Sequence, residues 1–382
     1  MVHTNVAGIA VMLVVVAAVR GAAADDDSLA AKLEEIRATR RVPALAAARL
    51  AEGSLAEVAC VGVRRLGTTE AVTIDDRFHL GSCGKSMTAT LLALLIADGK
   101  LRWDSTLGEL FPERIEAIHV GFRSTTVRQL VDHRAGLPAN TTARSAATSA
   151  VDPKQAPVEQ RLAILDAALA EPPEPIPARG HVYSNTGFLL AGAIIERVTA
   201  QPFEEVARER LFAPLGMTSA GFGPPGRDGS ASPWGHESLF DLVAPAPPRL
   251  PSAGHPPWYA PAGDLHANLA DALKFLALHV EAPAGDDARP IALPATALAV
   301  MHAPTAGADV ACGFALTTRA WTSGPVLAHG GTSAGWQACF ELSTQERVAF
   351  VVACNQGGAA ALDACRDALA LLAARHLAAR ER

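Results

Sequence analysis

Hydrophobic positions recur along the chain with two different periods. Near the N-terminus, SLAAKLEEIRATRRV (residues 28–42) has the apolar spacing of an amphipathic helix. The next segments, ALAAARLAEG (residues 44–53) and EVACVGVRRLG (residues 57–67), are predicted to be strands on either side of a turn at Gly53. The chain is therefore expected to open with a helix and a β-hairpin.

The middle of the chain is predicted to be mainly helical. FHLGSCGKSMTATLLALLIADGKL (residues 78–101) is apolar enough to be a buried helix. Shorter helical segments follow at residues 105–113, 125–138 and 158–170. Residues 185–217 predict two helices broken at Gln201–Pro202. The Pro- and Gly-rich residues 221–263 are predicted to form a long surface loop near a site.

The C-terminal part returns to a strand pattern. Predicted strands lie at residues 312–321, 325–331, 336–344 and 347–355, and a helix follows at residues 360–380. Strands at both ends with helices between them indicate an α/β fold, with one antiparallel sheet built from both termini and a mainly helical insertion. We assign the α/β part to about residues 29–81 and 290–377, and the helical part to about residues 82–289.

Composition narrows the classes of partner. The 382 residues are 49% hydrophobic, with a mean hydropathy of +0.19, as expected for a globular protein with a sizeable core. A net charge of -6 without a basic cluster argues against a nucleic-acid or anionic-membrane partner. The six cysteines are too sparse for a disulfide scaffold and have no metal-binding spacing. The expected partner is a small or neutral molecule.

The N-terminus predicts export. An apolar run from Val6 to Val19 precedes Ala22 and Ala24, which have the spacing of a signal-peptidase site. Residues 1–24 are therefore assigned as a signal peptide, and the mature protein is expected to be secreted or periplasmic. Because Lys and Arg are missing before the apolar run and Arg20 follows it, a retained membrane anchor is the alternative.

Ser82 and Lys85 form an S-x-x-K motif within the apolar stretch 78–101. Residues three apart share a helix face, so the two side chains can touch. One interpretation is structural, with Ser82 as an N-cap and Lys85 extended to water. The other is chemical, because a lysine kept from water can act as the base that activates a serine. A lysine near the positive end of a helix is explained better by chemistry than by folding.

Two further motifs could complete such a site. Tyr183 and Asn185 form a Y-x-N, in which the phenol could share the serine's proton and the amide could hold a substrate carbonyl or the lysine. Structurally, the same residues could be a packed tyrosine and a helix N-cap. His329-Gly330-Gly331-Thr332 ends a predicted strand, where glycines let a substrate approach the backbone and the Thr332 N–H could stabilise an oxyanion.

In this order and at these separations, S-x-x-K, Y-S-N and H-G-G resemble the serine β-lactamase and penicillin-binding-protein superfamily. The resemblance is to the branch of class C β-lactamases, D-Ala-D-Ala carboxypeptidases and family VIII esterases. It extends over about residues 29–377 and includes the supporting stretches LVDHRAGLP and VACNQGG. It implies a β-lactamase/transpeptidase-like fold and a covalent acyl-enzyme, with no cofactor or metal.

Site roles follow from the resemblance. It implies that Ser82 is the acylated nucleophile and that Lys85 and Tyr183 are the proton-transfer pair. Substrate-binding roles are implied for Asn185, His329, Gly331 and Thr332. The β-lactamases have lysine in the K-T-G where this chain has His329, which is mostly neutral at pH 7. Attraction for a substrate carboxylate is thereby weakened, which favours ester substrates over D-alanyl peptides and β-lactams.

Two alternatives stay open at this point. Gly331, Ser333 and Gly335 also form a G-x-S-x-G, followed by Asp363 and His376 in the order of an α/β-hydrolase. The predicted hairpin after Ser333 does not fit the strand-to-helix turn that this nucleophile requires. A non-catalytic wall- or peptide-binding protein with the same fold is the other alternative, and an intact Ser82, Lys85 and Tyr183 set argues against it.

The remaining histidines and tryptophans have simpler interpretations. Four histidines are expected to be loop or capping residues rather than metal ligands, namely His133, His236, His255 and His266. Trp234, Trp258 and Trp336 could line an acyl pocket or anchor long loops.

Overall fold

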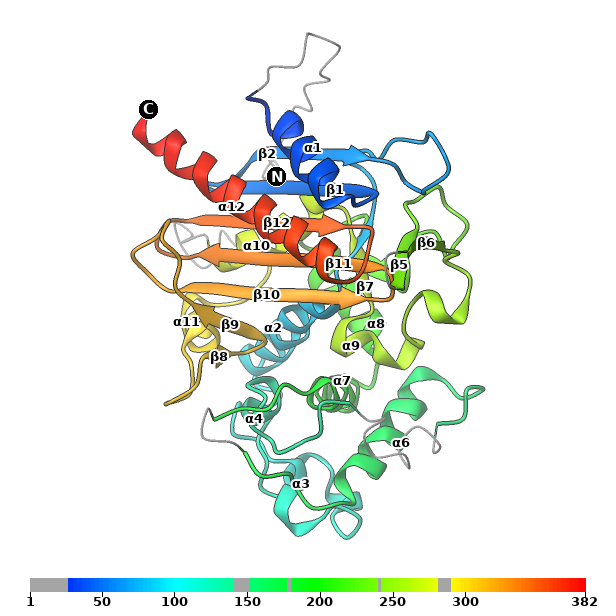
Figure 1. Ribbon diagram of the computed structural model, residues 1–382. Helices are drawn as coiled ribbons and strands as arrows, with labels where there is room; N and C mark the ends of the chain where they lie inside the picture. Colours follow the sequence, from blue (N-terminus) through cyan, green and yellow to red (C-terminus); the bar gives the residue numbers. More distant parts are fainter. Residues whose placement is uncertain (1–26, 141–150, 177–179, 240–241, 281–289) are drawn as a thin grey trace, which may run out of the picture.

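The computed structural model describes residues 27–140, 151–176, 180–239, 242–280 and 290–382. The predicted signal peptide lies outside the described residues. The described chain forms an antiparallel sheet covered by helices on both faces, with a helical layer beyond one face (Figure 1).

The main sheet has seven strands in the order β2-β1-β12-β11-β10-β9-β8. Its strands are β1 (Ala44–Ala51), β2 (Ser54–Gly62), β8 (Val310–Ala311), β9 (Phe314–Thr317), β10 (Val326–Ser333), β11 (Trp336–Ser343) and β12 (Val348–Cys354). β1 pairs with β12, so the first hairpin and the C-terminal strands join in the centre. This confirms the predicted sheet built from both termini. Positive φ at Glu52 and Gly53 makes the tight turn of the first hairpin.

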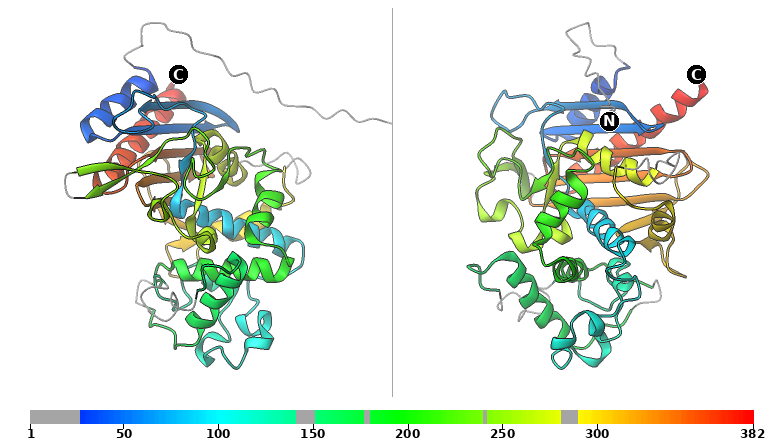
Figure 2. Two further views of the ribbon diagram at one scale, coloured as in Figure 1. Left: turned by 90° about the vertical axis from the view of Figure 1, so that its right-hand side faces the viewer. Right: turned by 180° about the vertical axis from the view of Figure 1, so that it is seen from behind.

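Alternating residues of β1 enter two separate cores. Ala46 and Ala48 face a core shared with Phe340 of β11, whereas Leu45 and Ala47 face a second core. The second core is covered by α1 (Leu29–Arg40) and α12 (Ala359–Glu381), and the first by α10 (Leu269–Val280). Figures 1 and 2 show α1 and α12 together on one face of the sheet and α10 on the other.

The central helix α2 (Gly84–Ala97) lies between the sheet and the outer helical layer (Figure 2). That layer contains α3 (Leu107–Leu110), α4 (Val127–Val131), α6 (Pro157–Leu169) and α7 (Asn185–Thr199). After α7, the chain breaks at Gln201–Pro202 as predicted and continues as α8 (Phe203–Ala207) and a π-helical turn (Arg208–Phe212). α10 falls in the range assigned to the helical part, but it packs on β12 and β1.

Two predictions for the middle of the chain were wrong. Residues 78–101 are not one helix, because β3 (Phe78–His79) and a 3-10 turn (Gly81–Cys83) precede α2. Residues 221–263 are not a single surface loop. They contain β4 (Gly221–Phe222), β5 (Gly235–Leu239), β6 (Leu242–Ala246) and a buried turn of helix, α9 (Ala260–Gly263). β4 and β3 pair with β7 (Leu265–Ala267), which holds this region against the central helix.

All six cysteines lie in the described part of the chain and are free thiols. Five are buried as small apolar residues, and Cys60 is half-buried. Within the described residues, no helix has both the length and the apolar character needed to cross a membrane.

Candidate active site

Ser82 lies in the 3-10 turn between β3 and α2. Gly81 has φ 52°, which turns the chain sharply before the serine. Lys85 is the second residue of α2, one turn after Ser82. The Nζ atom of Lys85 lies 3.1 Å from the Oγ atom of Ser82. The structure thus brings the S-x-x-K pair into direct contact.

Three oxygen atoms surround Lys85 Nζ. Besides Ser82 Oγ, they are Asn185 Oδ1 at 2.6 Å and the backbone carbonyl of Ala262. The Asn185 amide is fixed by its Nδ2, which donates to Asn140 Oδ1 at 2.7 Å. Amide and carbonyl oxygens only accept, so both must receive N–H from the lysine. A neutral amine has two N–H bonds and one lone pair, and that lone pair is left for the Ser82 hydroxyl.

Burial favours this neutral form. Lys85 has no exposed surface, and burial lowers the pKa of its ammonium to about 7, against a weaker opposing effect of the nearby Cys83 thiol. In the part of the chain that the structure describes, no carboxylate pairs with Lys85. Its nearest rings belong to Tyr183, 5.0 Å from Nζ, and Phe188, at 5.5 Å. Lys85 can therefore act as a base near neutral pH.

Tyr183 is placed beside the pair by the start of α7. Ser184, not Asn185, is the N-cap, with its side chain accepting from Gly187 N–H at 3.0 Å. Asn185 is therefore free to bind Lys85. Although 39% of Tyr183 is exposed, burial of its phenol raises the pKa to about 12, and its hydrogen bond with Ser82 only partly offsets this. The phenol is a proton donor at neutral pH.

Strand β10 contacts the serine turn through backbone atoms. A Cβ atom on Gly331 would lie 1.9 Å from the carbonyl oxygen of Leu80. This close approach explains why glycine is required there, and the substrate-binding role of Gly331 stays a prediction. One residue later, the Thr332 nitrogen lies directly beside Gly81, because a Cβ on that glycine would be 2.6 Å from it. The Cys83 thiol also donates to the His329 carbonyl. The amides of Ser82 and Thr332 thus come from adjoining backbones.

His329 is half-buried beside Tyr183, with ring centroids 6.5 Å apart. Burial, with a smaller effect of Lys85, lowers its pKa to about 4. Its Nδ1 lies 2.7 Å from the Gly330 carbonyl, which can only accept. Nδ1 therefore carries the proton of the neutral ring. The structure agrees with the expectation that this position holds no positive charge at pH 7.

The segment of residues 262–264 supports the serine turn and was not predicted from the sequence. Gly263, with φ 142°, packs on Gly81 and Ser82, since its Cβ would lie 2.8–2.9 Å from their backbone atoms. The preceding residue, Ala262, supplies the carbonyl that binds Lys85. The next, Asp264, lies 3.1 Å from His79 Nε2, and His79 Nδ1 accepts from Gly81 N–H. Only the Pro- and Gly-rich composition of this stretch pointed towards a site.

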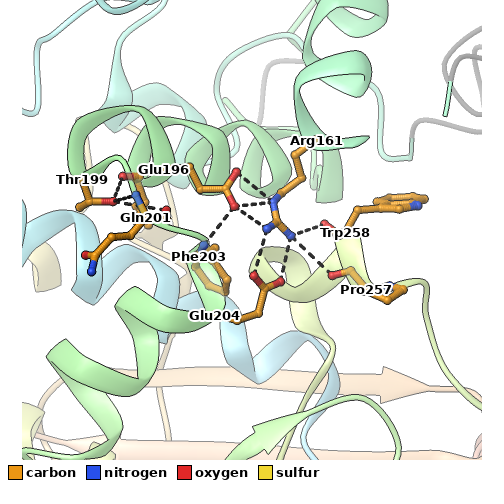
Figure 3. A network of polar contacts seen from close by, with 9 residues as sticks. Arg161, Glu196, Thr199, Gln201, Phe203, Glu204, Pro257 and Trp258 are labelled. Atoms are coloured by element: carbon orange, nitrogen blue, oxygen red, sulfur yellow. Dashed lines mark hydrogen bonds and ion pairs between the residues drawn. The ribbon is translucent and has the colours of Figure 1, made fainter. Parts of the chain in front are cut away.

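The same segment is fixed at its other end by a buried arginine. Arg161 of α6 has no exposed surface and binds Glu196 of α7 and Glu204 of α8. Its guanidinium also donates to the backbone carbonyls of Pro257 and Trp258, as Figure 3 shows. Through these two carboxylates and two carbonyls, Arg161 connects α6, α7 and α8 to the segment whose Ala262 carbonyl binds Lys85.

The G-x-S-x-G alternative is not assembled. Ser333 is buried in the β10–β11 hairpin, and its hydroxyl has no hydrogen-bond partner in the described structure. Asp363 instead lies near Arg40 and Arg366, and His376 packs against Trp321. These three residues do not form a triad.

The other singled-out residues have structural contacts. His236 accepts from Leu66 N–H and its second ring nitrogen lies 2.7 Å from the Asn355 carbonyl. His266 lies 2.7 Å from the Gly223 carbonyl, and His255 stacks on Tyr259. The tryptophans do not form a common acyl pocket. Trp336 is in the core against Phe78, Trp234 stacks under Arg65, and Trp258 is buried beside Tyr259.

The fold is β-lactamase/transpeptidase-like. A solved structure of a β-lactamase/D-alanine carboxypeptidase from Pseudomonas syringae superposes with a TM-score of 0.70 at 19% identity, covering 93% of this chain and 98% of that one. The sequence model of the Beta-lactamase family matches residues 29–375, and the chain belongs to this family. The resemblance stated from the motifs is confirmed.

Relatives in the family carry several hydrolase names. Penicillin-binding protein 4 of Amycolatopsis lactamdurans is 28% identical over 326 residues, which are 80% of this chain and 78% of that protein. Lovastatin esterase of Penicillium rubens is 26% identical over 218 residues, 53% of each chain. The chain is thus similar to both a penicillin-binding protein and an esterase.

Proposed function

We propose that the protein is an exported serine hydrolase that forms a covalent acyl-enzyme on Ser82 and favours ester substrates. The observation that carries the proposal is the contact between Ser82 Oγ and a buried Lys85 whose two other partners are pure acceptors. A non-catalytic binding protein would have no use for this arrangement. The buried lysine costs folding free energy and is matched to base chemistry.

The proposed acylation uses the contacts of Lys85. The Lys85 lone pair takes the Ser82 proton as Oγ attacks the substrate carbonyl carbon, and the carbonyl π electrons move to its oxygen. The amides of Ser82 and Thr332 are the donors for this oxyanion. When the tetrahedral intermediate collapses, the bond to the leaving group breaks and the leaving oxygen receives a proton from the Tyr183 phenol, which regains one from Lys85. Water then hydrolyses the Ser82 ester.

The preference for esters rests on His329. A charged lysine at this position would attract a substrate carboxylate, whereas the neutral imidazole does not. Charge-assisted hydrogen bonds contribute roughly 1.5–3 kcal/mol, so a carboxylate-bearing β-lactam or D-alanyl peptide loses more than a simple ester does. Similarity to an esterase supports the same choice.

Labelling tests the nucleophile. A fluorophosphonate probe is expected to form one adduct, which peptide mapping places on Ser82 and which Ser82→Ala abolishes. Ser333→Ala is the matched control, since it removes the serine of the alternative motif and should leave labelling intact. An adduct on Ser333 would contradict the proposal. Lys85→Ala and Tyr183→Phe should each slow acylation by a factor on the order of 10²–10⁴.

Substrate class is tested by kcat/KM for a short-chain p-nitrophenyl ester, nitrocefin and a D-Ala-D-Ala peptide, measured side by side at pH 7.5. The ester should be the best substrate. His329→Lys should raise β-lactam acylation by up to about tenfold for each 1.4 kcal/mol recovered. A parent enzyme that prefers nitrocefin and gains nothing from lysine would show that residue 329 does not set the substrate class.

A further inference from the structure

We propose that the cavity beside Tyr183 and His329 receives the leaving group of the substrate, and that this group is a small uncharged alcohol or phenol. The inference rests on the proposed function, because it assumes that Ser82 is acylated. The cavity has a volume of about 250 Å³ and lies between the helical layer and strands β8, β9 and β10 at one end of the sheet.

The position of Tyr183 places the cavity on the leaving-group side. Its ring forms part of the wall and lies 5.0 Å from Lys85 Nζ. A leaving oxygen takes its proton from one of these two groups, so the group attached to that oxygen must lie against them. His329 also lines the cavity and lies three residues before Thr332 on β10.

The described part of the walls offers no lysine or arginine to bind an anion. Among the described residues that line the cavity, none is Lys, Arg, Asp or Glu, and Val310, Phe314 and Ala315 make the edge-strand wall apolar. Burial lowers the pKa of His329 to about 4 and that of His133 well below its usual value. Both rings are neutral at pH 7.

Two further observations concern the ions that the cavity could bind. His181, also in the wall, lies 3.0 Å from the Asp309 carboxylate, which disfavours a second carboxylate nearby. Within the described structure, no three His, Cys, Asp or Glu side chains are placed to hold a metal ion.

The two neutral rings can still bind an uncharged polar substituent. His133 Nδ1 accepts from Ser184 N–H at 3.0 Å, so its Nε2 carries the proton and is a donor. His329 has the opposite tautomer, with Nε2 as an acceptor. The volume is below the roughly 300–1,000 Å³ of pockets for drug-sized ligands, which suits a group about the size of a substituted phenol.

A matched pair of esters tests the inference. Methyl 3-acetoxybenzoate and 3-acetoxybenzoate have the same acetyl group, and their leaving phenols carry a neutral methyl ester and a carboxylate, respectively. Release of acetate is followed, so that cleavage of the methyl ester is not counted. Each kcat/KM at pH 7.5 is divided by the hydroxide-catalysed rate constant of the same ester, which removes the difference in intrinsic reactivity. The parent enzyme is expected to prefer the uncharged ester by at least about tenfold.

Adding a cation to the wall should reverse the discrimination. Ala315 is exposed on β9, so Ala315→Arg is compatible with the fold. This variant should raise the corrected kcat/KM of the charged ester by about ten- to a hundredfold, and should change that of the uncharged ester by less than about threefold. Thr318→Arg is the control, because it adds the same charge at an exposed position outside the cavity. It should leave the ratio within about twofold.

Equal corrected rates for the two esters in the parent enzyme would overturn the inference, as would equal effects of Ala315→Arg and Thr318→Arg. Both results leave the proposed function intact, provided that the probe still labels Ser82. If Ala315→Arg does not fold, His329→Lys adds a cation to the same cavity and should likewise raise the ratio of the charged-ester to the uncharged-ester kcat/KM, whatever its effect on the uncharged ester alone. No turnover of either ester and no Ser82 adduct would overturn the proposed function and the inference together.

Discussion

At the scale of single residues, burial lowers the pKa of Lys85, and its three hydrogen-bond partners determine how the neutral amine is oriented. Ser82 can donate to the amine, whereas Asn185 and the Ala262 carbonyl can only accept from it. A buried amine in this arrangement is most useful when neutral, and its pKa of about 7 lets half of the molecules reach that state at neutral pH. Because the Asn185 amide is uncharged, it does not stabilise the ammonium form of Lys85 as a carboxylate would.

This predicts a pH dependence. Because Lys85 is an active base only when deprotonated, kcat/KM for a neutral ester should fall as the pH drops through about 7. A carboxylate in contact with Nζ would stabilise the ammonium, so Asn185→Asp should move this midpoint upward by about 1–3 pH units. Asn140→Asp is the control, since Asn140 contacts the far side of the Asn185 amide. Unchanged midpoints in both variants would contradict the assignment of Lys85 as the base.

Residue spacing predicted part of this site and could not predict the rest. Ser82, Lys85 and Asn185 were identified because their side chains form motifs that can be recognised in the sequence. The Ala262 carbonyl belongs to no such motif, because every residue has a carbonyl and only the path of the backbone determines where it points. His79 was missed for a related reason, since its partner Asp264 is distant in sequence.

At the scale of elements, the site depends on the fit between the serine turn and β10. Gly331→Ala would place a Cβ 1.9 Å from the Leu80 carbonyl, and a backbone atom cannot move away as a side chain can. The serine turn must then shift away from the Thr332 amide. We expect a loss in acylation on the order of 10²-fold or more, with far-UV circular dichroism unchanged.

Gly84→Ala is the matched control for this prediction. Its Cβ would meet the Leu265 side chain at 3.5 Å, an ordinary contact, although it is closer in sequence to Ser82 than Gly331 is. Its acylation rate should stay near that of the parent enzyme. Equal losses in both variants would show that any added methyl group disturbs the turn.

The Arg161 cluster predicts a loss of stability. Arg161→Met leaves Glu196 and Glu204 without their buried cation, which should lower the free energy of unfolding by about 3–5 kcal/mol. Arg197→Met breaks an exposed pair with Glu113 and should cost less than about 1 kcal/mol. Urea denaturation of both variants gives the comparison, and similar values would refute the importance of burial here.

The elements themselves were predicted with uneven success, for physical reasons. The first hairpin and β10 to β12 were identified because runs of small and β-branched residues separated by turn residues favour strands. Residues 78–101 were predicted to be one helix because apolar residues occur throughout this stretch. Without a regular alternation with polar residues, the sequence pattern does not show that the helix begins only at Gly84. Strands of two or three residues such as β4 and β7 are fixed by tertiary pairing, which a local pattern does not contain.

At the scale of the whole molecule, the sheet joins chain segments about 300 residues apart in sequence. Leu45 of β1 pairs with Cys354 of β12, so strand β10 is connected to the N-terminal hairpin through the two C-terminal strands β11 and β12. The helices α1 and α12 cover the same face, and Arg40 joins them through Asp367 (Figure 1). Neither end of the described chain can form this face alone.

Truncation tests this dependence. Ending the chain after Gly358 removes α12, which exposes the second core of the sheet, including Phe350 and Val352. An uncovered apolar sheet face promotes aggregation, so this variant should be insoluble. Ending the chain after Leu377 instead removes five exposed residues and one surface ion pair, that of Arg380 with Glu346. That variant should keep its Tm within about 2 °C and should keep the proposed esterase activity. A soluble, active chain ending at Gly358 would show that the sheet does not need α12.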